Sequence, residues 1–508
     1  MAQKSARERA RSAHRGGTAP PDAARQPPVR IAMIGVMLAL LLAMIENTVV
    51  GTAVPTIVGE IGGMSHLSWV VTAYTLATAV TTPVWGKLGD TLGRRQIFLV
   101  SIAVFLAGSA LSGTAHSMAV LIAYRIVQGI GAGGLAVTAF AVIGDLVPPR
   151  ERGTYQSMTA AVVAIGTIGG PLLGGFVTDS LGWRWVFYIN VPIGIVAFVW
   201  CALCLKLPRK RPERVRIDYQ GALLLGVAIT AITLVTTWGG EKCAWGSVQI
   251  VGLAVAGVAA LGAFLWWETR ASDPVLPLRL FRVRNVTTSA VLSAVLGAMM
   301  FGASTYLPLF QQTVLGVSAS NSGFLLLPMM GALMVVSTIA GRRITRTGTY
   351  RSRALVGCGL MVVATYGLST MGTDTSQLTC SLYMALLGCG MGLLMQMPLL
   401  VAQNSVGRED LGVSSAAVTM FRTIGGSLGV AVFGALLNRA ITNGMHGAAT
   451  GQLSTSDLAG LTDSLRVRYL ESITSGIDTI YVCATAIALL GLAAMWCTRE
   501  ERLRGAGE

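Results

Sequence analysis

Stretches of about twenty mostly apolar residues recur along the whole chain, separated by short segments rich in Gly, Pro and charged residues. A helix that crosses a bilayer needs about 20 such residues, because its backbone polar groups must be satisfied within the helix. The pattern predicts fourteen membrane-spanning helices and no large soluble domain. They are expected near 31–54, 68–86, 97–114, 118–143, 154–179, 186–205, 219–238, 247–267, 287–309, 320–340, 353–371, 378–403, 413–438 and 476–497.

Composition supports a membrane protein, and the placement of Lys and Arg predicts how the spans are oriented in the membrane. The chain is 53% hydrophobic and only 12% charged, which excludes an ordinary soluble protein. Of its 38 Lys and Arg residues, 31 lie in the N-terminal tail, in every second connection or in the C-terminal tail. Positive residues favour the cytoplasmic side, so both termini are expected in the cytoplasm. The net charge of +15 is therefore a topology signal, not a sign of nucleic-acid binding.

Two polar segments lie outside the spans. Residues 1–30 are rich in Arg, Ala and Pro and are typical of a disordered basic tail. Residues 440–475 are the only long connection on the outer side. Within them Leu458, Leu461 and Leu465 have helical spacing, so a short interfacial helix and a flexible loop both stay open.

Two charged residues lie inside predicted spans of the N-terminal half. Glu46 is in the middle of "LALLLAMIENTVVGTAVPTI", and Arg125 is in "LIAYRIVQGIGAGG" with Gln128 one turn further on. An ionisable residue within a span is a functional-site hypothesis by default, although a structural Arg is the alternative. Counting residues from the outer end of each span, Glu46 lies roughly 12 Å deep and Arg125 roughly 10 Å deep. We therefore expect the two charges to offset each other's burial cost.

Two glycine-rich motifs also lie in the N-terminal half of the chain. In "GKLGDTLGRRQIF", Gly86, Gly89 and Gly93 allow a tight turn and close helix approach, and Asp90 is expected to pair with Arg94 or to lie at a helix N-terminus. In "AIGTIGGPLLGGFVTD", glycines recur every four residues on one helix face, and Pro171 is expected to bend the helix.

These motifs resemble those of the major facilitator superfamily, in its fourteen-span drug:proton antiporter branch of the EmrB/QacA type. "ENTVVGTAVP" fits the pattern D-x-T-x-V-x-x-A-x-P of that branch, with Glu46 in place of the usual Asp. The motif with Arg125 resembles the family's motif B, whose Arg is linked to proton transfer. The other matches are to motif A at Gly86, Asp90, Gly93, Arg94 and Arg95, and to motif C at Gly166, Gly170, Pro171, Gly174 and Gly175.

The resemblance implies a fold and an activity. The fold is all-α, with a six-helix bundle over 31–206, loops and two extra helices over 207–286, a second six-helix bundle over 287–497 and a short tail over 498–508. In the family, motif A joins one bundle to the other, and motif C seals the bundle interface of exporters. The expected function is proton-coupled efflux of amphipathic drugs by alternating access, with Glu46 and Arg125 as coupling residues. Export of an endogenous metabolite, lipid or siderophore on the same fold is the alternative.

The sequence does not favour an enzyme. "GIGAGG" lies inside an apolar helix, where a dinucleotide fingerprint needs a preceding strand, and no phosphate-binding G-x-x-x-x-G-K-[ST] occurs. The four His are isolated, so no metal is expected, and the missing phosphate-binding motif argues against ATP. No cofactor is expected, and the charge pattern argues against nucleic acid. We expect a monomer in a bacterial cytoplasmic membrane, in contact with lipid, protons and a small amphipathic substrate. Its cavity is predicted to involve Asn47, Trp69, Tyr74, Gln128, Met300, Tyr306, Gln396 and Arg422.

Overall fold

The fold is helical throughout the part that the structure describes. The computed structural model describes residues 29–62, 67–147, 149–205, 207, 218–239, 243, 246–272, 274–315, 326–372, 375–445 and 463–500. Apart from an isolated β-bridge between Gly239 and Cys243, these residues form helices and short connections.

The helices fall into two groups with an inserted pair between them. The first group is α2 (Val29–Ile61), α3 (Leu67–Leu92), α4 (Arg94–Gly113), α5 (Met118–Leu146), α6 (Pro149–Leu181), α7 (Arg184–Tyr188) and α8 (Asn190–Cys204). The inserted pair is α9 (Tyr219–Trp238) and α10 (Val248–Glu268), followed by the 3-10 turn η3 (Leu278–Arg282). The second group is α11 (Arg284–Thr313), α13 (Leu327–Thr347), α14 (Arg351–Leu368), α15 (Gln377–Leu394), α16 (Met397–Asn404), η4 (Arg408–Asp410), α17 (Leu411–Gly444) and α19 (Asp463–Cys497).

Several helices begin where a polar side chain can accept from the backbone. The side chains of Ser117, Asp218, Ser247 and Ser376 accept hydrogen bonds from backbone N–H groups in the first turns of α5, α9, α10 and α15. A helix N-terminus leaves its first N–H groups without partners, and such caps satisfy one of them. The polar residues between the apolar runs therefore fix where these helices start.

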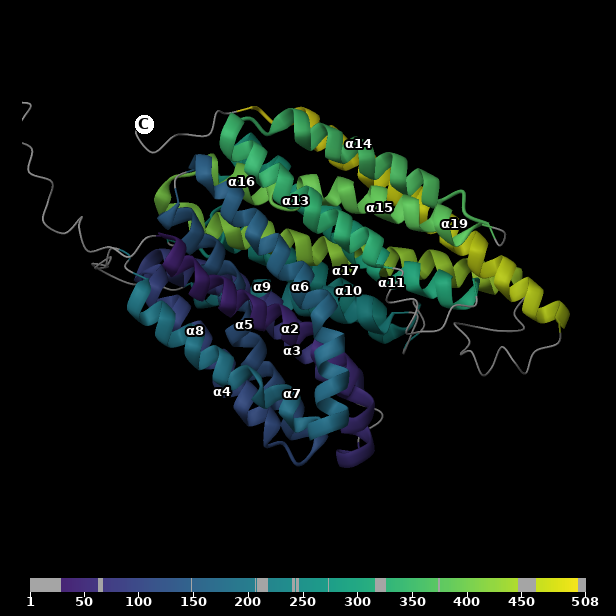
Figure 1. The fold of residues 1–508 in the computed structure, drawn as a ribbon, viewed down its shortest axis with the longest axis horizontal. Helices are drawn as coiled ribbons and strands as arrows, with labels where there is room; N and C mark the ends of the chain where they lie inside the picture. The colour runs from purple at the N-terminus through teal and green to yellow at the C-terminus, as the bar shows by residue number, and fades with distance from the viewer. Residues whose placement is uncertain are drawn as a thin grey trace, which may run out of the picture.

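The two groups form two bundles that meet at one end of the molecule. Figure 1 shows the N-terminal bundle in purple and blue and the C-terminal bundle in green and yellow, close together at the left and diverging towards the right. Within the first bundle α3 packs on α5, α4 on α5 and α2 on α6, and within the second α11 packs on α17 and α13 on α15. Between the bundles, α6 packs on α13 and α3 on α17.

Polar contacts join the bundles where α3 ends and α17 begins, which we call the α3–α17 end. Asp90 of α3 accepts hydrogen bonds from the backbone N–H groups of Gly412 and Val413, at 3.0 and 2.9 Å. Gln403 of α16 donates to the carbonyl of Phe140 in α5 at 3.1 Å. Apolar side chains of α16 and α17 pack against Phe140 beside this bond. This end of the bundle interface is closed in the structure.

Ten helices among the described residues are long and apolar enough to cross a membrane, counting α7 with α8 and α15 with α16 as single spans. Four more long helices lie at the remaining predicted positions, namely α3, α6, α13 and α14, with 26, 33, 21 and 18 residues. The helical order agrees with the sequence pattern, while fourteen spans stay a prediction.

The expected loop over 440–475 is wrong in its bounds. Helix α17 continues to Gly444 and α19 already begins at Asp463, so both helices run into the predicted loop. Ile441 and Met445 are buried in the same apolar cluster as Tyr469 and Ile473, and this packing explains why the helices continue beyond the most apolar residues. Leu465 belongs to α19, whereas Leu458 and Leu461 lie outside the described residues.

Candidate functional site

Glu46 lies in the middle of α2 and its side chain is fully buried. One carboxylate oxygen forms an ion pair with Nη1 of Arg125 in α5. The other accepts a hydrogen bond from Nδ2 of Asn190 at the start of α8. The structure thus brings the two intramembrane charges into contact, as their matching depths predict. Glu46 connects three helices of the N-terminal bundle.

Arg125 extends this connection to a fourth helix. Its Nε donates to the carbonyl of Val70 in α3 at 3.1 Å, and its Nη1 donates to Oε1 of Gln128 at 2.7 Å. The guanidinium lies 4.2 Å from the centre of the Tyr74 ring, a favourable cation–π arrangement. Because Arg125 is only 1% exposed, its charge is balanced by Glu46 and by these neighbours, not by water.

Asn190 is a site residue that the sequence analysis did not select. Its Nδ2 also lies 3.0 Å from Oγ of Ser109 in α4, and Ser109 donates to the carbonyl of Phe187. The side chain is 1% exposed. An Asn within the apolar segment "VFYINVPIG" is the signal that could have identified it, since a buried amide needs polar partners.

The arrangement can couple protonation to helix packing. When Glu46 is ionised, the pair is neutral overall and both carboxylate oxygens have donors. A proton on Glu46 would leave Arg125 as a buried cation without its counter-charge, which is costly in an apolar interior. Protonation therefore favours rearrangement of α2 against α5 and α8. The Nε2 of Gln128 is buried without a hydrogen-bond partner, so a further polar contact is open beside the pair.

The motif around Asp90 joins the two bundles. Both sequence alternatives hold: Asp90 pairs with Arg94 at 2.6 Å and also accepts from the N-terminus of α17. Arg94 forms a second ion pair with Asp145 of α5 at 2.5 Å, and Arg95 donates to the carbonyl of Ala202 in α8. This short motif, which spans the end of α3 and the start of α4, therefore contacts α5, α8 and α17, so five elements are joined at this end.

The expected tight turn over Gly86–Phe98 is wrong in its extent. Helix α3 continues through Gly86 and Gly89 to Leu92, and only Gly93, with φ 102°, breaks the helix. Gly86 serves close approach instead, because a Cβ there would lie 2.8 Å from the Cβ of Ala416 in α17. The hydrogen-bonding and packing gained against α17 account for the longer helix.

The glycines of α6 pack against α2. A Cβ on Gly166 would lie 2.7 Å from Cβ of Met44, and the hydroxyl of Thr48 donates to the Gly166 carbonyl at 3.1 Å. Gly170 lies directly against Thr48. Gly174 is buried and Gly175 has open space beside it, while the side chain of Pro171 lies outside what the structure describes.

The residues predicted to line a cavity do not form one group. Tyr74 and Gln128 belong to the Glu46 site, and the side chain of Asn47 is outside the described part. The others lie in separate places. Trp69 contacts Trp238 of α9, Met300 packs in the C-terminal core, Tyr306 donates to the Val430 carbonyl, and Arg422 donates to the Met395 carbonyl beside Gln396.

No group of three or more His, Cys, Asp or Glu side chains with metal-binding geometry occurs among the described residues. Cys201 and Cys204 of α8 are free thiols, and Cys201 packs against Gly35 of α2.

The chain resembles proteins of one family along most of its length. Residues 36–430 match the family model of the Major Facilitator Superfamily. An uncharacterised MFS-type transporter of Mycobacterium tuberculosis is 40% identical over 93% of this chain and 70% of its own length. Two Bacillus subtilis proteins are also similar: the multidrug transporter protein MdtP, 36% identical over 87% and 80% of the two chains, and multidrug resistance protein 3, 33% identical over 84% and 83%.

Solved structures share the fold at low sequence identity. The human organic anion transporter MFSD10 has a TM-score of 0.63 at 16% identity, covering 92% of this chain and all of its own. The proton:xylose symporter XylE has a TM-score of 0.62 at 14% identity, covering 94% and 97%. The family match, the multidrug relatives and this fold agree: the chain is a multi-pass membrane transporter, not an enzyme, and belongs to the Major Facilitator Superfamily.

Proposed function

We propose that the protein exports amphipathic drugs across a bacterial cytoplasmic membrane in exchange for protons, by alternating access. The observation that carries the proposal is the fully buried ion pair between Glu46 and Arg125. A buried, paired carboxylate at the junction of several helices is suited to binding a proton and passing on the change in charge. The names of the two Bacillus relatives support drugs as the substrate class.

The proposed topology has fourteen spans with both termini in the cytoplasm. The support is the asymmetry of Lys and Arg along the chain, of which the motif at Lys87, Arg94 and Arg95 is one part. With this orientation the α3–α17 end faces the cytoplasm. The conformation described here is then the one closed towards the cytoplasm.

In the proposed cycle, protonation of Glu46 from outside releases Arg125 from its counter-charge. The bundles then rock so that the contacts at Asp90 open towards the cytoplasm. Loss of the proton to the cytoplasm leaves Glu46 ionised and restores the pair. Amphipathic substrate enters between the bundles while the cytoplasmic end is open and leaves when the outer end opens.

The test measures transport of a fluorescent amphipathic drug into everted membrane vesicles with an imposed pH gradient, where uptake into the vesicle corresponds to export from the cell. Glu46→Gln keeps the size of the side chain but removes its titration, so we expect pH-driven transport to be lost. Glu60→Gln is the matched control, because Glu60 lies on the same helix in an exposed ion pair with Arg184. Normal pH-driven transport by Glu46→Gln would disprove the assignment of Glu46 as the proton carrier.

A further inference from the structure

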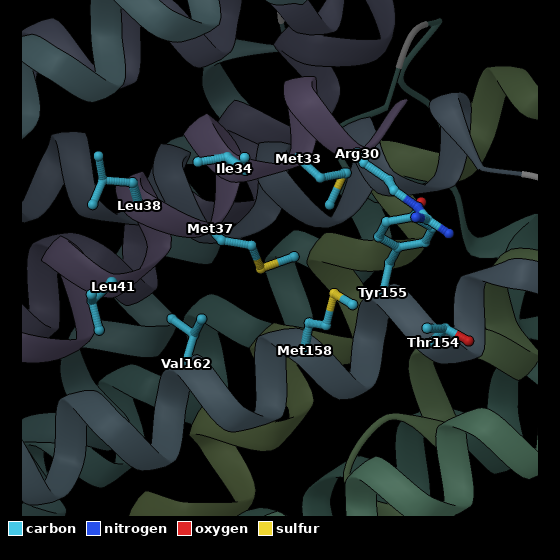
Figure 2. A pocket seen from close by; sticks show the side chains of 10 residues that line it. All are labelled: Arg30, Met33, Ile34, Met37, Leu38, Leu41, Thr154, Tyr155, Met158 and Val162. Carbon is cyan, nitrogen blue, oxygen red and sulfur yellow. The ribbon is translucent and has the colours of Figure 1, made fainter. Parts of the chain in front are cut away.

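A groove runs along the surface between α2 and α6, outside the Glu46 site. It has a volume of about 820 Å³ and extends along α2 from Arg30 to Leu41. Figure 2 shows its lining side chains, with α2 contributing one row and α6 the other. At 1.5 Å per residue the groove is roughly 16 Å long, close to the half-thickness of about 15 Å that one leaflet's hydrocarbon occupies.

The groove is open on its outer side, where lipid would lie. Two apolar side chains that line it are exposed on the outside of the bundle: Ile34 of α2 is 56% exposed and Met158 of α6 is 47% exposed. On α6 the exposed apolar row continues past the groove to Ile165 and Phe176. An apolar row that stays exposed along a span faces the hydrocarbon of the bilayer. The occupant therefore comes from the membrane.

Polar groups gather at one end of the groove. Figure 2 shows Arg30, Tyr155 and Thr154 together at that end, while Leu41 and Val162 lie at the other. Arg30 lies in the first turn of α2, and it takes part in none of the ion pairs between described residues. A guanidinium and a phenol at the level of the headgroups suit a phosphate, since Arg pairs with phosphate through two parallel hydrogen bonds.

The apolar part of the groove suits a flexible chain. Met33, Met37 and Met158 line its middle, and unbranched Met side chains adapt to irregular apolar partners. The order of groups along the groove, from cation to apolar floor, is the order of groups along a phospholipid. We propose that this groove binds one anionic phospholipid of the leaflet at the α3–α17 end, with its phosphate at Arg30 and one acyl chain along α2.

The site has a consequence for the helix that carries Glu46. The groove ends at Leu41, little more than one turn before Glu46, and α2 meets α6 just beyond it at Thr48 and Gly166. A lipid held between α2 and α6 stabilises their separation at the α3–α17 end. Which leaflet supplies the lipid rests on the proposed orientation, but binding itself does not depend on transport.

The test measures lipid binding to the purified full-length protein in detergent. Phosphatidylglycerol and phosphatidylcholine with identical acyl chains are titrated separately, and bound lipid is counted by native mass spectrometry. Arg30→Gln should weaken phosphatidylglycerol binding about tenfold, the loss expected for one charge-assisted contact. Phosphatidylcholine should be affected less, because its choline cation offsets the charge of the phosphate that Arg30 meets. Met37→Trp, which fills the groove, should weaken binding of both lipids.

Two controls keep the result specific. Arg282→Gln removes another exposed Arg, outside the groove, and should leave binding unchanged. Glu46→Gln should also bind phosphatidylglycerol normally, so a failure of the proposed proton coupling is distinguishable from a failure of this site. Unchanged binding by Arg30→Gln, or an equal loss in Arg282→Gln, would overturn the proposal. So would a Met37→Trp variant that keeps its lipid but no longer exports drug, because the groove would then be a drug path.

Discussion

Gly170 of α6 lies against Thr48 of α2 so closely that a Cβ added to the glycine would sit 1.8 Å from the threonine hydroxyl oxygen. The hydroxyl also bonds to the carbonyls of Ile45 and Gly166, so it is held in place. Helices α2 and α6 therefore touch through backbone and small side chains, which requires glycine on one of them.

Gly170→Ala should destabilise the protein by about 1–3 kcal/mol, because overpacking forces the two helices apart. Gly169→Ala is the matched control, since a Cβ at Gly169 meets nothing within 4 Å. Thermal unfolding of the purified variants measures the difference. Equal melting temperatures for the two variants would show that the contact is not tight in solution.

Asn190→Ala should also be destabilising, by about 1.5–3 kcal/mol, because it removes the donor to one oxygen of the buried Glu46 carboxylate. The same variant should change the pH dependence of drug efflux, which a purely structural loss would not. Asn438→Ala, at a partly exposed position of α17, serves as the control. An unchanged pH profile in Asn190→Ala would argue against a role of this residue in proton binding.

The ion pair between Glu60 and Arg184, near the C-terminal end of α2, should make a pH-dependent contribution to the stability of the fold. Hydrogen bonds from Arg184 and Trp183 hold the pKa of the Glu60 carboxyl below its ordinary value. Because folding favours the ionised carboxylate, the stabilisation from Glu60 is present above the pKa of about 4.3 that the group has in the unfolded chain. It is lost as the pH falls through the lower pKa that the group has in the folded protein. The difference in melting temperature between wild type and Glu60→Gln should therefore be present at neutral pH and vanish in acid. A difference that grows in acid would contradict this assignment.

Asp90→Asn should loosen the α3–α17 end. The variant keeps the shape of the side chain but loses the charge that faces Arg94 and the N-terminus of α17. A cysteine placed at the fully buried Ser414, in a background without other cysteines, reports this opening through its rate of thiol labelling. We expect faster labelling with Asp90→Asn. Labelling as slow as in the parent would mean that packing alone keeps this end closed.

The sequence predicts best what depends on burial in lipid. Apolar runs place the helices, and the depth of Glu46 and Arg125 along their spans predicts their contact, because both charges need a partner in the same low-dielectric layer. Asn190 stands out in the sequence only as an amide within an apolar segment, and its partners Glu46 and Ser109 are fixed only when three helices are packed.

Helix ends were predicted less well. Polar and glycine residues between Gly86 and Leu92 suggest a turn, yet this segment is helical because α17 packs on it. The early start of α19 has the same cause, since Tyr469 and Ile473 are buried against residues near the end of α17. These helix ends depend on contacts between segments that are distant in the sequence, and the local pattern of apolar and polar residues carries no information about such contacts.

The pair of Glu46 and Arg125, which connects α2, α3, α5 and α8, has a thermodynamic consequence. If the spacing of these helices differs between two conformations, the protein's affinity for a proton differs between them as well. Thermodynamic linkage makes this effect reciprocal. If a bound substrate changes the protein's affinity for the proton by some factor, a bound proton changes the protein's affinity for the substrate by the same factor. One buried pair would therefore let two ligands that never touch regulate each other's binding.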